Sequence, residues 1–130
     1  MNQKRRAASP KECALTTPEK ISLALSALEG RKAVDPVLLD MRDLTIITDY
    51  FLICHGTSST HLRGLVDAVT TELTKKGARP ASVEGSDESG WTLIDYGDLI
   101  VHIFAEEERS FYSLERLWSD APRVAAAAEA

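Results

Sequence analysis

The sequence predicts an α/β domain, with a small mixed sheet of about five strands packed by helices. Short continuous apolar runs, typical of strands covered on both faces, alternate with segments whose apolar residues recur at helical spacing. A third pattern, two apolar runs separated by a tight turn, indicates a hairpin in the C-terminal part. The 130 residues, of which 44% are hydrophobic, are enough for one domain with one core.

Composition divides the chain into one domain and two tails. Residues 1–16 are polar and aperiodic, and residues 121–130 are rich in alanine. Both segments are therefore predicted to be disordered tails. Residues 17–120 are predicted to form the single folded domain.

Three predicted elements occupy the first half of the domain. A helix is predicted from Thr17, as the cap, and Pro18 to Gly30. Short apolar runs at residues 37–39 and 50–54 predict two strands. The polar turn at residues 55–59 then leads into a second helix that ends near Gly77.

The second half is predicted to contain three strands and a last helix. Residues 81–84 form a short strand, and residues 91–96 and 99–105 form a hairpin with a turn at Gly97. The last helix begins near Glu106, because acidic side chains favour a helix N-terminus. Its apolar stripe, which is expected to be buried, consists of Phe111, Leu114, Leu117 and Trp118.

The net charge of −5 is unevenly distributed. Residues 1–80 hold 12 Lys and Arg against 9 Asp and Glu, whereas residues 81–120 hold 2 against 10. An acidic half repels phosphate backbones and attracts basic surfaces. We therefore expect a basic protein partner and no direct sequence-specific binding of nucleic acid.

The compartment is predicted from what the sequence lacks. No apolar run approaches the roughly 18 residues of a membrane span, and the basic N-terminus has no apolar segment behind it. The two cysteines, Cys13 and Cys54, do not make a disulfide framework. The predicted location is the cytoplasm, without a membrane partner.

No pattern for catalysis or metal binding is found. Residues 56–58 could present backbone amides to a phosphate, but a helix cap explains this turn better. Asp95 and Asp98 straddle a turn and do not form the Asp-x-Asp pair that holds metal ions in nucleotidyltransferases. The spacing of the three histidines matches no zinc motif. No enzyme activity, metal or cofactor is expected.

The hairpin carries polar groups on one strand face. Leu99, Val101 and Ile103 share a core face, while Asp98, Ile100, His102 and Phe104 share the other. A buried unpaired Asp or His is costly, so this second face has internal partners or meets another molecule.

Two turn geometries remain open for the hairpin. A two-residue loop at Tyr96 and Gly97 places Asp95 opposite Asp98 and Trp91 opposite His102. A three-residue turn instead sends Trp91 and Leu93 to the core side. With the first geometry, the residues predicted to contact a partner are Glu84, Trp91, Leu93, Asp95, Asp98, Ile100 and His102.

The segments DYFLICHGTS, GWTLIDYGDLIVHIF and ERSFYSLERLW resemble the ribosomal silencing factor (RsfS/Iojap) family. The resemblance covers residues 18–122 in the right order. One departure is His55, which stands where a small hydroxyl residue is usual.

This resemblance implies a fold related to nucleotidyltransferases but without their catalytic acids. It also implies binding to the large ribosomal subunit through its ribosomal protein number fourteen. The bound factor blocks joining of the small subunit and represses translation when nutrients are short. Self-association as a homodimer is implied too. The alternative functions are a nucleotide-binding or nucleotidyl-transferring enzyme of the same fold, and a general homodimeric adaptor.

Overall fold

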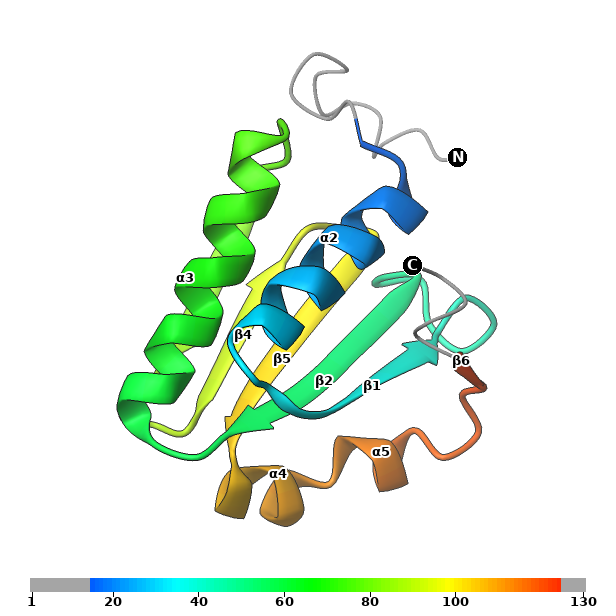
Figure 1. Cartoon of the computed structure of the whole chain (residues 1–130). Coiled ribbons are helices and arrows are strands. Elements are labelled where there is room, and N and C mark those ends of the chain that lie inside the picture. Colours follow the sequence, from blue (N-terminus) through cyan, green and yellow to red (C-terminus); the bar gives the residue numbers. More distant parts are fainter. Residues whose placement is uncertain (1–14, 125–130) are drawn as a thin grey trace.

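The computed structural model describes residues 15–124, which form one open six-stranded sheet with helices on both faces (Figure 1). The strand order is β3-β4-β5-β2-β1-β6. The central pair, β2 and β5, is parallel, and the other neighbouring strands are antiparallel. The mixed α/β sheet predicted from the sequence is thereby confirmed. The strands are β1 (Val34–Asp40), β2 (Tyr50–Gly56), β3 (Ser82–Ser86), β4 (Trp91–Asp95), β5 (Leu99–Ala105) and β6 (Arg123–Val124).

The two longer helices, α2 (Thr17–Gly30) and α3 (Ser59–Lys75), cover one face of the sheet (Figure 1). Their apolar stripes pack on alternate residues of β2 and β5, such as Leu52 and Val101, to form the larger core. Burying these side chains from both layers is the main favourable contribution to folding. The helix residues in this core include Ile21, Ala24, Leu25, Leu28, Leu62, Leu65, Val69 and Leu73.

Helix α2 is capped by Thr16, one residue earlier than the sequence predicts. The Thr16 hydroxyl accepts from the Glu19 N–H at 3.2 Å, and the Glu19 carboxylate accepts from the Thr16 N–H at 2.9 Å. This reciprocal pair is a capping box, which needs an acid three residues after the cap. Thr17 is therefore the first helical residue, and its hydroxyl donates to Asp98 at 2.5 Å.

The predicted C-terminal tail begins too early. Residues 121–124 are part of the folded structure, and β6 pairs with β1 through Leu38 and Leu39. Ala121 is buried in the second core. The alanine-rich composition concealed this short edge strand, which raises the number of strands from about five to six. The other residues predicted to be tails, 1–14 and 125–130, lie outside the described residues.

The β4–β5 hairpin has a register that neither predicted turn geometry describes. Asp95 pairs with Ile100, Leu93 with His102 and Trp91 with Phe104. The Tyr96 N–H donates to the Leu99 carbonyl at 2.8 Å, so Gly97 and Asp98 form the loop. Gly97 has φ = 88°, which glycine adopts readily. The pairing is shifted by two residues, and for this reason every side chain of β4 and β5 keeps the face that the two-residue geometry assigned to it.

The predicted last helix is broken into α4 (Glu106–Tyr112) and α5 (Leu114–Leu117). Ser113 separates them in a left-handed conformation, with φ = 47°. The break changes which side chains face the sheet. Phe111 is 80% exposed and Leu117 69% exposed, so the prediction that they are buried is wrong. Leu114 is buried as predicted, and Trp118 is half-buried.

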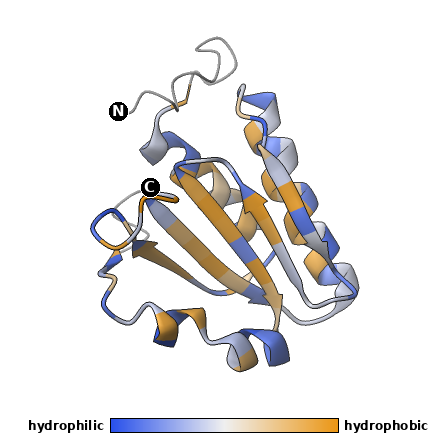
Figure 2. Ribbon diagram, turned by 180° about the vertical axis from the view of Figure 1, so that it is seen from behind, coloured by the Kyte–Doolittle hydropathy of each residue, from blue (hydrophilic) through white to orange (hydrophobic). Residues whose placement is uncertain are grey.

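The second face of the sheet is covered only in part. Helices α4 and α5 lie along one edge of it, as Figure 2 shows from behind. The central strands β2 and β5 place Phe51, Ile53, Ile100 and Phe104 on this side. The smaller core beneath consists of Leu39, Met41, Phe51, Ile53, Ile100, Phe104, Leu114 and Ala121, with half-buried Val37, Trp91, Leu93 and Trp118 packed against it.

Candidate partner-binding surface

Six of the seven side chains predicted to contact a partner lie on this second sheet face. Directly paired residues of neighbouring strands point to the same side. Two cross-strand rows therefore bring these side chains together. One row runs Glu84, Leu93, His102, Ile53 and Val37, and the next runs Ser82, Asp95, Ile100, Phe51 and Leu39. Trp91 follows beside them, paired with Phe104. We call this side of the sheet, where Phe51, Trp91, Leu93, His102, Phe104 and Tyr112 lie together, the aromatic face.

Trp91 is a half-exposed ring held by three neighbours. It stacks on Phe104 with 5.0 Å between ring centroids and an interplanar angle of 28°. The Tyr112 ring of α4 lies 4.6 Å away, centroid to centroid. The indole Nε1–H donates to His102 Nδ1 at 3.2 Å. Aromatic contacts and a satisfied indole N–H fix the ring in one orientation while leaving part of it open to solvent.

His102 is 3% exposed and stands behind Trp91. Burial lowers the pKa of its imidazole to about 4, so the ring is neutral at pH 7. Because Nδ1 accepts from Trp91, the proton of the neutral ring is on Nε2. Nε2 has no hydrogen-bond partner among the described residues. His102 therefore orients Trp91 and, like the buried Ile100, is not itself a contact surface in the free protein.

A hollow of about 290 Å³ opens beside Trp91. It is lined by Glu84, Gly85, Ser89, Trp91, Leu93 and Tyr112. Gly85 has φ = 88°, and a Cβ at this position would lie 2.0 Å from the Trp91 carbonyl oxygen. Only glycine fits there, and it lets β3 approach the start of β4 closely.

The charges on this face are acidic. The Glu84 side chain is exposed, and its carboxylate has no hydrogen-bond or ion-pair partner among residues 15–124. Asp95 is half-exposed and accepts from the Gly97 N–H at 2.7 Å. None of the five strands β1 to β5 contains a lysine or an arginine.

Asp98 does not join the other six residues, and this departs from the predicted surface. Its carboxylate turns toward α2, where it pairs with the Lys20 ammonium at 3.0 Å and accepts from Thr17. The side chains of Lys20 and Asp98 are 4% and 13% exposed. Lys20 and Asp98 are 78 residues apart along the chain, and no local pattern marked Lys20 as the partner of Asp98.

Arg109 is a residue that sequence reasoning missed. It is buried in α4, where it donates to Glu115 at 2.7 Å, to the Val34 carbonyl at 3.2 Å and to His55 Nδ1 at 2.9 Å. This cluster fastens α4 to β1 and β2 and so positions Tyr112. Burial and the Arg109 charge lower the pKa of His55, which stays neutral and accepts. Arginine is usually exposed to solvent, and Arg109 follows three glutamates in the sequence. The sequence therefore did not indicate that its side chain is buried.

The polar turn before α3 and the Cys54 thiol have structural roles. Ser58 caps α3 by accepting from the His61 N–H at 3.0 Å, which confirms the predicted helix cap. Burial raises the pKa of the Cys54 thiol to about 12, so it is unreactive at pH 7. Within residues 15–124, no group of three or more His, Cys, Asp or Glu side chains is placed to hold a metal ion.

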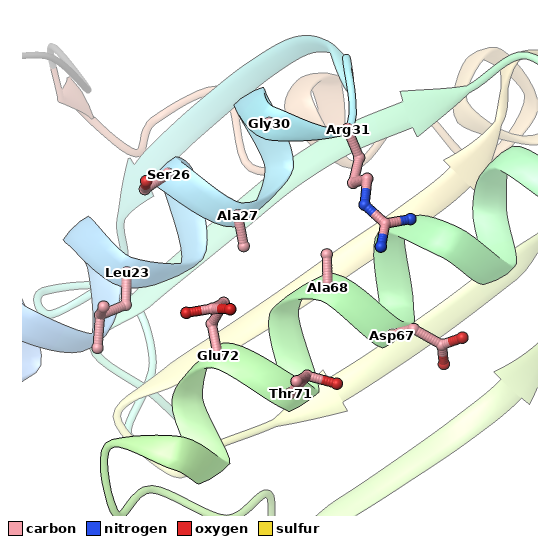
Figure 3. A pocket seen from close by; sticks show the side chains of 9 residues that line it. All are labelled: Leu23, Ser26, Ala27, Gly30, Arg31, Asp67, Ala68, Thr71 and Glu72. Atoms are coloured by element: carbon pink, nitrogen blue, oxygen red, sulfur yellow. The ribbon is translucent and has the colours of Figure 1, made fainter.

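A second hollow lies between α2 and α3, on the opposite side of the molecule (Figure 3). Its floor is made by Ala27 and Ala68, which point toward each other from the two helices, and its rim carries Arg31, Asp67 and Glu72. It contains no histidine, cysteine or aromatic ring. Nothing in this groove resembles a reaction site. No helix within the described part of the chain is long and apolar enough to cross a membrane.

The fold and this surface define a small α/β domain whose distinguishing feature is an aromatic face with acidic neighbours. A family model described as "Ribosomal silencing factor during starvation" matches residues 14–130. The chain belongs to this family. Membership supports a role in ribosome silencing, and the family is named for silencing rather than for a reaction.

Relatives and solved structures agree with this assignment. The chain is 39% identical over 102 residues to the ribosomal silencing factor RsfS of Bacillus subtilis, covering 78% of this chain and 86% of the relative. A Chromobacterium violaceum crystal structure matches with a TM-score of 0.78 and 30% identity, over 81% of this chain and 88% of that one. A Bacillus halodurans crystal structure matches with a TM-score of 0.72 and 35% identity, over 81% and 95%.

Proposed function

We propose that this protein silences ribosomes without catalysis, by binding the large ribosomal subunit through its ribosomal protein number fourteen. The bound domain sterically blocks the small subunit and so represses translation under nutrient limitation. Family membership supports the target, and the aromatic face supports the mode of binding.

The observation that carries this proposal is the aromatic face itself. Trp91 and Leu93 are half-exposed on a sheet face that α4 and α5 cover only along one edge. A few residues, among which tryptophan is enriched, carry most of the binding energy at protein interfaces. Glu84 and Asp95 flank them, and β1 to β5 supply no lysine or arginine. Such a surface complements a basic protein rather than bare RNA.

A steric mechanism requires only tight, oriented binding. The described residues contain no metal-binding group, and the Cys54 thiol is protonated and buried. A domain that occupies the surface at which two ribosomal subunits meet would prevent their joining by excluded volume alone. We also propose that the protein acts in the cytoplasm and that it associates with a second copy of itself; the exposed Phe111 and Leu117 support the latter.

The test is sedimentation of the protein with purified large subunits, followed by a subunit-joining assay. We expect the protein to sediment with large subunits, to lower the yield of joined ribosomes and to lose affinity as salt rises. Substitution of Trp91 by alanine should weaken both effects. An exposed acid on α2, changed in Glu29→Gln, provides a control because it lies on the opposite layer.

Two outcomes would contradict the proposal. A folded wild-type protein that stays in the supernatant would remove the large subunit as partner. Saturable binding of a nucleotide with magnesium at micromolar concentration would favour the enzymatic alternative instead.

A further inference from the structure

The hollow beside Trp91 combines one carboxylate with two aromatic rings. Glu84 pairs across the strands with Leu93, which places its carboxylate diagonally opposite Trp91. The Tyr112 ring closes the hollow from α4, tilted by 45° against the indole. We propose that this hollow is a subsite for one arginine side chain of the protein partner, with its guanidinium on Glu84 and over the rings. The identity of that partner rests on the proposed function.

The electrostatics of the hollow call for a cation. Glu84 has no basic partner among residues 15–124. The hollow is also lined by Tyr112 of α4. The nearest arginine of the same helix, Arg109, is already engaged with Glu115, His55 and the Val34 carbonyl. The negative charge at the hollow is therefore not neutralised from within the described residues.

The shape of the hollow favours arginine over lysine. A guanidinium is planar, so it can lie on an aromatic ring while its N–H groups reach a carboxylate. Leu93 offers an apolar floor for the aliphatic part of the side chain. A volume of about 290 Å³ leaves room for a single long side chain.

The subsite is formed before any partner arrives. Trp91 stacks on Phe104 and donates a hydrogen bond to His102. Arg109 binds α4, the helix that carries Tyr112, to β1 and β2. Because Gly85 has no side chain, β3 can lie close to the Trp91 backbone. Because these groups are already ordered, binding loses little free energy to ordering them.

The direct test uses short peptides and needs no ribosome. Acetylated Gly-Arg-Gly amide and its citrulline analogue, which has the same shape but no charge, are titrated into the full chain at low salt. Nuclear magnetic resonance follows the two indole N–H signals, with Trp118→Phe used to assign them. We expect the arginine peptide to shift the Trp91 signal and leave the Trp118 signal in place. The citrulline peptide should have little effect.

Variants then test the carboxylate. Glu84→Gln removes the ion pair but keeps the rings, so it should weaken binding of the arginine peptide about twofold to fivefold, as expected for one exposed ion pair. Glu29→Gln, the matched control, should bind the peptide as wild type does. A third peptide, with lysine in place of arginine, tests the preference for a guanidinium. The subsite would be overturned if the citrulline or the lysine peptide bound as tightly as the arginine peptide. It would also be overturned if Glu84→Gln bound the arginine peptide as tightly as wild type does.

Sedimentation with large subunits separates the two proposals. If wild type sediments with large subunits and Glu84→Gln does so equally well, the subsite is wrong while the proposed function stands. If the arginine peptide binds as expected but wild type does not sediment, the subsite stands and the proposed partner is wrong. A weaker affinity of Glu84→Gln for large subunits, with Glu29→Gln unaffected, supports both.

Discussion

Substitution of Asp98 by asparagine should unfold this protein more easily rather than weaken an interface. The Asp98 carboxylate pairs with Lys20 at 3.0 Å, and the two side chains are 13% and 4% exposed. Thr17 donates to the same carboxylate, so the group joins the hairpin loop to the first turn of α2. Asparagine keeps the shape but leaves the Lys20 ammonium buried without a counter-charge.

The expected loss follows from that unpaired charge. Breaking a buried ion pair from one side costs about 3–5 kcal/mol. Because Asp98 keeps some contact with water, we expect about 3 kcal/mol. This is a large part of the roughly 5–15 kcal/mol that stabilises a typical domain, and it corresponds to a fall in Tm of about 10 °C or more.

Urea denaturation of wild type, Asp98→Asn, Lys20→Met and the double variant measures the effect and the coupling between the two residues. Asp120→Asn, at an exposed residue, is the control. A free energy of unfolding within about 0.5 kcal/mol of wild type, the usual range for surface substitutions, would refute this reasoning. Loss of ribosome binding by a variant of undiminished stability would return Asp98 to the interface.

Three further changes have expected outcomes. Trp91→Ala should cost about 2 kcal/mol or more in binding to large subunits, whereas Trp91→Phe, which keeps a ring, should cost less; equal affinity of wild type and the alanine variant would remove the anchor. Trp118→Ala should cost about 2 kcal/mol of stability, measured by urea denaturation, because its ring is only half-buried against Phe51. The free energy of unfolding should also fall by about 3 kcal/mol as the pH is lowered from 6.5 to 4. In this range His102 is protonated in the unfolded chain but stays neutral in the folded protein, where its pKa is about 4. His102→Gln should lose most of this pH dependence, and a variant with the wild-type dependence would show that other groups cause it.

Much of the candidate surface could be predicted because strand residues alternate. Alternation in residues 99–105 placed Ile100 and His102 on one face, and that assignment holds although the predicted pairing was off by two residues. The error arose because a turn can be assigned to different residues around Gly97 without changing the pattern. Its φ of 88° and the Tyr96–Leu99 hydrogen bond exist only in the folded hairpin.

The last helix shows where periodicity fails. The stripe of Phe111, Leu114 and Leu117 has helical spacing, but Ser113 interrupts the helix and turns two of these three side chains to solvent. Arg109 replaces them as the buried anchor, because three acceptors from β1, β2 and α5 converge on its guanidinium. A hydrophobicity pattern contains no information about such convergence.

The sequence by itself determined the order of the elements from α2 to β5, the faces of the strands and the acidic character of the second half. These properties depend on neighbouring residues, through alternation, helical spacing and turn preferences. Only the tertiary structure decided that Asp98 belongs to Lys20, that Arg109 is buried, and that Glu84, Trp91 and Tyr112 line one hollow. Each of these groupings joins residues from elements that meet only when the sheet assembles, so its partners are chosen by packing rather than by distance along the chain.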